Sequence, residues 1–185
     1  MVLPNDVNSA SAVGTYSRLR RHILIYGTAQ LLLCLLQTTL FARFRILGIT
    51  PDLCLLLTLG AAMHEGSECG GAVGLFCGFL ECALGGIGSS ALPILFLILG
   101  YGVGQLSGRT LPRTFPSYLI LAASLCVLRP AVTLAAIGLA AQTEAFELPV
   151  ILRGTLLPEM LVNFLFSLPM YPLIRKLHSA AQKKV

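Results

Sequence analysis

Glycine recurs at every fourth residue from Gly66 to Gly78, and this spacing constrains the fold more than any other feature of the chain. In water, each glycine would cost a helix about 1 kcal/mol relative to alanine. In a bilayer the backbone has no competing water, and small residues let a second helix approach closely. The segment is therefore predicted to be a membrane helix that packs against another helix. On a helix, one face roughly 80° wide holds Gly70, Gly74, Gly78, Glu81, Gly85 and Gly88.

The glycine spacing returns in the next apolar segment, at Gly100, Gly104 and Gly108. Two consecutive helices with glycines one turn apart are natural partners for each other, because small side chains bring the two backbones together. The helix-packing positions predicted from this pattern are Gly66, Gly70, Gly74, Gly78, Gly85, Gly88, Gly100, Gly104 and Gly108.

The composition excludes a soluble domain of useful size. Of the 185 residues, 56% are hydrophobic and only 11% are charged, and the mean hydropathy is +0.83. Soluble domains carry about 25% charged residues. The chain is therefore predicted to be a polytopic membrane protein, and no cofactor is expected.

Six apolar segments are predicted to cross the membrane, so the expected fold is all-α, a bundle of six transmembrane helices in one domain over residues 23–176. Residues 1–22 and 177–185 are expected to be cytoplasmic tails, the first disordered over residues 1–17 and the second basic. The six predicted spans cover about residues 23–42, 46–63, 69–88, 91–109, 117–141 and 149–174.

Basic residues predict the orientation of this bundle. With six spans, nine basic residues fall on the side of the two termini and two on the other side. Such an excess marks the cytoplasmic side, so both termini are expected to be cytoplasmic. The basic residues behind the net charge of +5 are thus expected to set the membrane orientation and to contact anionic lipid. No nucleic-acid partner is expected. The nine residues are Arg18, Arg20, Arg21, Arg109, Arg113, Arg175, Lys176, Lys183 and Lys184, against Arg43 and Arg45.

Polar residues in the first two spans predict where those spans face the interior. Tyr26, Gln30 and Gln37 share one helical face, which we expect to point into the protein. Pro51-Asp52 predicts an irregular backbone before a helix that begins at Leu53.

Ionisable residues at membrane depth are the candidates for chemistry, because a lone charge there costs at least ~2.5 kcal/mol. Arg129 is the only central cation, which makes Glu81–Arg129 or Glu159–Arg129 the expected ion pairs. The cluster could be a ligand or ion site, or an internal clasp that holds the bundle together, and the second interpretation is favoured. Its members are Asp52, Glu81, Arg129, Glu159 and Asn163.

Catalytic and metal sites have little support. Ser89-Ser90 lies in a predicted turn without an intramembrane base to activate a hydroxyl. His64, with Glu65 and Glu68, is expected to be solvated in a cytoplasmic turn rather than to bind a metal. The six cysteines lie in apolar segments without a CxxC pair, so they are interpreted as small buried residues. An enzyme is not expected.

Several motifs resemble those of the MreD family of rod-shape-determining membrane proteins. They are Pro51-Asp52-Leu53, the glycines through Gly74 and Gly78-Phe79, and Gly100-Tyr101 with Gly104. The chain ending is also similar, with Leu157, Asn163, Pro169, Pro172 and Arg175-Lys176. The resemblance covers about residues 25 to 178. One position departs from the family pattern, because the family aspartate position is Cys82 here and the nearby acid is Glu81.

The resemblance implies a non-enzymatic scaffold of the cell-elongation machinery in the bacterial inner membrane. Proteins of this family bind the bitopic protein MreC and work with the MreB filament, the glycosyltransferase RodA and its partner transpeptidase. They support peptidoglycan synthesis and cell shape. Their six-helix fold is similar to that of the S components of energy-coupling-factor vitamin transporters.

The alternative function is an S component that captures a small molecule, such as a vitamin, from outside. The cluster of Asp52, Glu81, Arg129 and Glu159 supports it. Minimal outer loops and the lack of the small-residue docking motif in the first span argue against it. A small permease would need paired broken helices in two halves of the chain, which the sequence does not contain.

Overall fold

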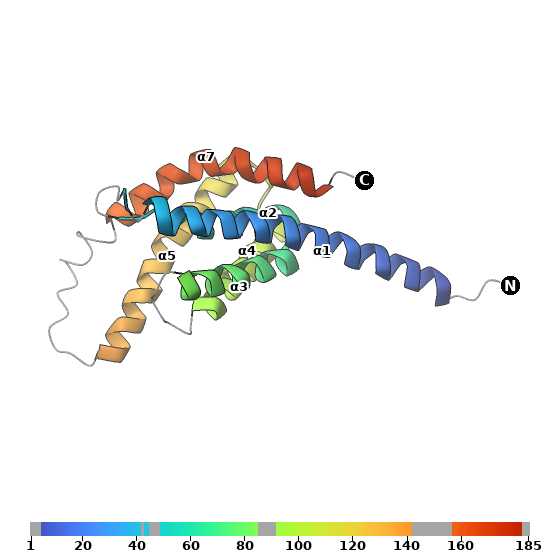
Figure 1. Cartoon of the computed structure of the whole chain (residues 1–185), viewed down its shortest axis with the longest axis horizontal. Coiled ribbons are helices and arrows are strands. Elements are labelled where there is room, and N and C mark those ends of the chain that lie inside the picture. Colours follow the sequence, from blue (N-terminus) through green and yellow to red (C-terminus); the bar gives the residue numbers. More distant parts are fainter. Residues whose placement is uncertain (1–4, 42, 45–48, 85–91, 142–156, 183–185) are drawn as a thin grey trace.

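The computed structural model describes residues 5–41, 43–44, 49–84, 92–141 and 157–182, and its elements are helical (Figure 1). The all-α prediction is confirmed. The elements are α1 (Asn5–Leu36), a π-helical turn η1 (Gln37–Phe41), α2 (Leu53–Glu65), α3 (Ser67–Leu84), α4 (Leu92–Arg109), α5 (Phe115–Ala141) and α7 (Leu157–Gln182).

Four helical segments in the described part of the chain are long and apolar enough to cross a membrane. The sequence predicts six spans, so two of the predicted spans correspond to shorter helical segments. Two shorter apolar segments, Leu53–Glu65 and Phe115–Leu128, correspond to the predicted second and fifth spans. The four long segments are Arg20–Phe41, Ser67–Leu84, Leu92–Arg109 and Leu157–Gln182.

Helix α2 lies at the centre of the molecule. Every residue from Leu53 to His64 is buried, and α1, α3, α4, α5 and α7 all contact α2. Its 13 residues cover about 20 Å, which is less than the hydrocarbon thickness of a bilayer, about 30 Å. The helix is therefore shorter than the predicted span over 46–63, and residues 49–52 before it are not helical, as the irregular entry at Pro51-Asp52 predicted. The segment is apolar all round because other helices enclose it.

Both ends of α2 are fixed by single residues. At its start, the Asp52 carboxylate accepts a hydrogen bond from the Leu55 N–H at 3.0 Å, so the helix begins at Leu53 as the sequence predicts. At its end, Gly66 has a φ of 96°, and its N–H donates to the Ala62 carbonyl at 3.1 Å. This one-residue turn leads straight into α3. Gly66 was predicted to pack helices together, but it serves the turn instead, since a Cβ there would meet nothing within 4 Å.

Helices α3 and α4 form a close hairpin through their glycines (Figure 1). A Cβ on Gly70 would lie 2.7 Å from the Gly100 carbonyl oxygen, and a Cβ on Gly100 would collide with the Gly70 carbonyl. A Cβ on Gly74 would collide with the backbone of Phe96. At the two ends of the hairpin, Gly78 faces the backbone of Pro93 and Gly104 faces that of Ser67. The backbones can approach this closely only because these positions have no side chain.

Other glycines behave differently from the sequence pattern. Gly108 faces open space, so it does not pack against a helix as predicted. Gly85 and Gly88 lie outside the described residues. Gly60, which the pattern does not single out, lies directly under the Ile174 side chain and lets α7 approach α2.

Both predicted tails contain helix. The disorder expected over residues 1–17 is wrong from Asn5 onward, because α1 begins there. The predicted basic tail from residue 177 begins within α7, which continues to Gln182 and is not broken by Pro169 or Pro172. Extending an existing helix costs far less than nucleating a new one, which favours continuation at both ends. The start of α1 and the end of α7 lie at the same end of the molecule (Figure 1).

Candidate functional site

Asp52 and Asn163, two members of the predicted polar cluster, meet at the start of α2. The backbone N–H of Asp52 donates to the Asn163 side-chain oxygen at 2.6 Å, and both residues are buried. The next N–H, that of Leu53, donates to the Gln37 side-chain oxygen at 3.1 Å. The first N–H groups of a helix have no partner within it. Here α7 and η1 supply the missing acceptors, so this corner ties three elements together.

The polar face predicted on the first span points inward as expected. Tyr26 and Gln30 are fully buried, and Gln37 is partly buried. The Gln30 side-chain amide donates to the Cys54 carbonyl of α2 at 3.0 Å. Each of these polar groups thus joins α1 or η1 to the central helix.

The remaining members of the predicted cluster are distributed over three helices. Glu81 is buried on α3, and it lies close enough to the Cys77 thiol to act on it electrostatically, as does Asp52. Glu159 is partly buried in the first turn of α7, where the helix dipole favours an acid. Arg129 is in α5, but its side chain lies outside the described residues. The predicted ion pairs with Arg129 therefore stay predictions.

Replacing Asn163 by leucine is expected to destabilise the protein by about 1 to 2 kcal/mol, because the buried Asp52 N–H would lose its acceptor. Reversible unfolding in mixed micelles measures this cost. The neighbouring Phe164 is exposed, so Phe164→Leu is the matched control and should stay within about 0.5 kcal/mol of the wild type. Equal stability of the two variants would contradict the role given to Asn163.

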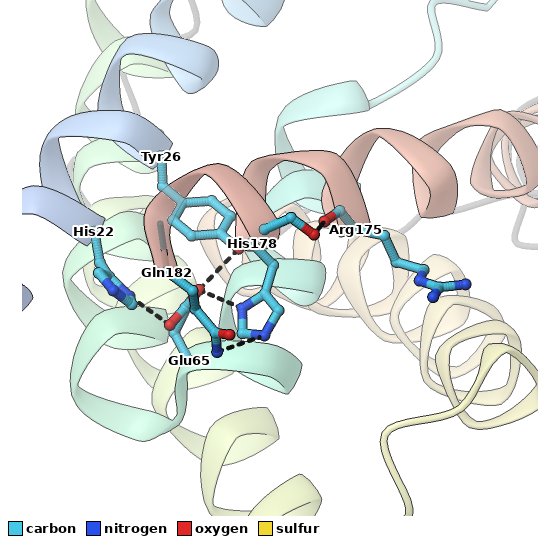
Figure 2. Close-up of polar contacts among 7 residues, drawn as sticks. His22, Tyr26, Glu65, Arg175, His178 and Gln182 are labelled. Atoms are coloured by element: carbon cyan, nitrogen blue, oxygen red, sulfur yellow. Dashed lines mark hydrogen bonds and ion pairs between the residues drawn. The ribbon is translucent and has the colours of Figure 1, made fainter. Parts of the chain in front are cut away.

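A second polar cluster, which we call the Glu65 clasp, joins α1, α2 and α7 at the other end of α2. It consists of His22, Tyr26, Glu65, His178 and Gln182, and Figure 2 shows the two imidazole rings on either side of the Glu65 carboxylate. His22 Nδ1 lies 2.5 Å from one carboxylate oxygen, and His178 Nδ1 lies 2.7 Å from the other. Tyr26 donates its hydroxyl hydrogen to Glu65 at 3.2 Å. Three donors from two helices therefore converge on one acid.

The hydrogen bonds around His178 indicate which of its nitrogens carries a proton. Its Nε2 lies 3.0 Å from the Gln182 side-chain nitrogen, which donates in this arrangement. Nδ1 is then the protonated nitrogen and donates to Glu65, an assignment made from the hydrogen-bond pattern. Next to the clasp, the Arg21 side chain donates to the Ala180 carbonyl at 3.2 Å and joins α1 to α7 a second time.

His64 lies beside the clasp. Its ring centroid is 5.0 Å from that of His178 and 6.3 Å from that of Tyr171. Burial lowers the pKa of His64, the neighbouring His178, Arg113 and Arg175 lower it further, and Glu65 opposes them. The solvated turn predicted for His64 and Glu65 is therefore wrong, because both side chains are largely enclosed between helices.

The Glu65 clasp escaped the sequence analysis because its parts are far apart in the chain. His22 and Glu65 are 43 residues apart, and Glu65 and His178 are 113 apart. One signal was available, since His22 and Tyr26 are spaced one helical turn apart, as are His178 and Gln182. Such pairs mark one polar face on each helix, but they do not identify the partner.

The six cysteines are free thiols, five of them buried and Cys82 half-buried. Their positions fit the interpretation as small residues within the helical bundle. Within the described ranges, no group of three or more His, Cys, Asp or Glu residues is arranged to hold a metal ion.

Comparisons with family models, with curated proteins and with solved structures found no match to this chain. The structure itself defines the class. The chain is an all-helical membrane protein with a short buried helix at its centre and polar contacts at both ends of that helix.

Proposed function

We propose that this protein is a non-catalytic scaffold of the bacterial inner membrane, of the kind that the MreD resemblance implies. It would bind MreC and thereby support peptidoglycan synthesis, cell elongation and cell shape, together with RodA, its partner transpeptidase and MreB. The observation that carries the proposal is that buried polar groups tie outer helices to α2. Groups used in this way stabilise a rigid bundle with defined outer surfaces.

The residues of the MreD-like motif support the proposal through their burial. Pro51, Asp52, Gly74 and Gly78 are buried, and packing or capping accounts for each of them. Tyr101 is different because it is 48% exposed on α4, where its hydroxyl accepts a hydrogen bond from Gln105 at 3.0 Å. Packing within this chain does not account for Tyr101, which makes it the motif residue best placed to contact a partner.

The proposed topology has both termini in the cytoplasm. Five exposed basic residues support it, because each lies within two residues of a group that contacts α2 at Met63 or Glu65, or acts electrostatically on His64. The end of α2 at the Glu65 clasp would face the cytoplasm and anionic lipid, and the corner at Asp52 would lie towards the outer face. The five residues are Arg20, Arg109, Arg113, Arg175 and Lys176.

The second candidate is a binding subunit for a small molecule, similar to an S component. The buried carboxylates of Asp52 and Glu81 favour it, because acids inside a membrane domain commonly mark ligand or ion sites. The contacts of the Asp52 corner with α7 and η1 favour the scaffold instead.

Purification of the tagged protein in mild detergent, with mass spectrometry of bound proteins and small molecules, tests both candidates. We expect recovery of a single-span periplasmic protein with a coiled coil, of the MreC kind. Recovery of a vitamin-sized ligand in equal amount together with an ATPase module, without such a partner, would overturn the scaffold and support the binding subunit.

A matched pair of variants sharpens this test. Tyr101→Ala is expected to lower recovery of the MreC-like partner by at least about tenfold, as removal of an aromatic residue central to an interface does. Ile120→Ala, at an exposed site on α5, should leave recovery unchanged. Both positions are exposed, so neither change disturbs the core. Equal recovery with both variants would exclude Tyr101 from the interface.

A further inference from the structure

The Glu65 clasp places two titratable side chains against one carboxylate between three helices. The Glu65 side chain is only 6% exposed, whereas His22 and His178 are 18% and 21% exposed. The acid is therefore sheltered, and both imidazoles have access to water. Histidine changes its charge between about pH 5 and pH 8, so this arrangement can respond to pH near neutrality.

Both histidines can hold an extra proton without losing their contact with Glu65. Each already faces the carboxylate through Nδ1, so the second proton would enter at Nε2. For His178, the Gln182 amide would then turn to present its oxygen in place of its nitrogen. The Glu65 carboxylate then faces a positively charged imidazole in place of a neutral one, and the attraction between opposite charges strengthens the contact.

Other charged groups limit how many protons the clasp gains. One proton on the histidine pair balances the charge of Glu65, whereas a second leaves a net positive charge near Arg21, Arg113 and Arg175. The first proton on the histidine pair therefore strengthens the contacts of His22 and His178 with Glu65, and a second proton does not. The titratable groups that act on or contact Glu65 are His22 and Tyr26 of α1, His64 of α2, Cys69 of α3 and His178 of α7. The cations beside them are Arg21 of α1, Arg113 before α5 and Arg175 of α7.

His64 acts in the opposite direction. Because the folded protein lowers the pKa of His64, the unfolded chain takes up its proton first as the pH falls. Its effect on the free energy of unfolding is absent above the unfolded pKa of about 6.5 and becomes destabilising below it. The response of the clasp must therefore be measured locally, at α1 and α7, rather than as global stability.

We propose that the Glu65 clasp is a pH-sensitive latch that takes up one proton, shared between His22 and His178, and then holds α1 and α7 more tightly against α2. Without that proton, the ends of α1 and α7 separate from α2 more often. The latch thus changes how firmly α1 and α7 are held at the end of the molecule from which the start of α1 extends (Figure 1).

Hydrogen exchange of the full-length protein in lipid nanodiscs tests the latch. Amide protection over residues 20–30 and 174–182 is compared at about pH 6 and about pH 8, either side of the histidine range, after correction for intrinsic exchange rates. We expect protection to be about fivefold higher at the lower pH, from one contact between opposite charges. Protection across the α3–α4 hairpin should not change with pH and serves as the internal reference.

Variants separate the latch from a purely structural contact. The double variant His22→Gln/His178→Gln is expected to lose the pH response, and Glu65→Gln should lose it as well. Tyr26→Phe removes a hydrogen bond that does not titrate in this range, so it should lower protection equally at both pH values. Equal corrected protection of the wild type at both pH values would overturn the proposal, as would a pH response that survives in the double variant.

Discussion

Replacing Gly74 by alanine is expected to force α3 and α4 apart and to destabilise the protein by roughly 2 to 3 kcal/mol. The new methyl group would collide with the carbonyl of Phe96, and on its other side it would meet the Thr58 side chain at 3.3 Å. The nearest obstacle is backbone, which cannot rotate away, so the helices themselves must move. Reversible unfolding in mixed micelles measures the loss.

Gly71→Ala is the matched control, because it makes the same change one turn earlier on the same helix. A Cβ there would lie 3.6 Å from Tyr101, an ordinary contact distance. We expect Gly71→Ala to change stability by less than about 1 kcal/mol, or to stabilise the helix slightly, since alanine favours helix over glycine. If both variants lost the same stability, close backbone approach would not explain the glycine at residue 74.

Replacing Glu65 by leucine is expected to have the second large effect, a loss of about 3 kcal/mol. The change leaves the hydroxyl of Tyr26 and the imidazoles of His22 and His178 without their common acceptor, and Tyr26 is fully buried. Glu65→Gln keeps one acceptor oxygen and should fall between the wild type and Glu65→Leu. The same unfolding measurement checks both.

Glu68→Leu is the control for this prediction, because Glu68 is exposed in the first turn of α3 and close to Glu65 in the chain. Its change should stay within about 0.5 kcal/mol of the wild type. A loss for Glu68→Leu as large as for Glu65→Leu would show that general charge near the turn, rather than the clasp, stabilises this end.

The glycine pattern illustrates what local sequence could predict. Regular spacing in two neighbouring apolar segments indicated that they form a close helical hairpin, and the structure brings Gly70, Gly74, Gly78, Gly100 and Gly104 to that interface. The pattern failed at Gly66 and Gly108, because spacing alone does not reveal where a helix ends or which surface remains open. Gly60 was missed because it is a single glycine without a repeat.

In the candidate sites, too, the sequence predicted which residues of the first span face inward but not which residues they contact. Tyr26 and Gln30 were predicted to face inward, because polar residues on one face of an apolar helix have to avoid lipid. Their partners could not be predicted. Glu65 was interpreted as solvated, since a polar turn between two helices is usually at the surface. Only the packing of α1 and α7 against α2 places donors around it.

The sequence by itself determined that this chain is an all-helical membrane protein, because its composition cannot cover a surface in water and a bilayer leaves a backbone few alternatives to helix. It also determined the start of α2 at Leu53 and the pairing of α3 with α4, which depend on residues close together in the chain. Tertiary structure alone decided that α2 is enclosed rather than exposed to lipid, and that Glu65 joins three helices. The physical reason is that hydropathy records how strongly a segment avoids water but not which neighbour shields it, so a short buried helix and a lipid-facing helix have the same sequence signature.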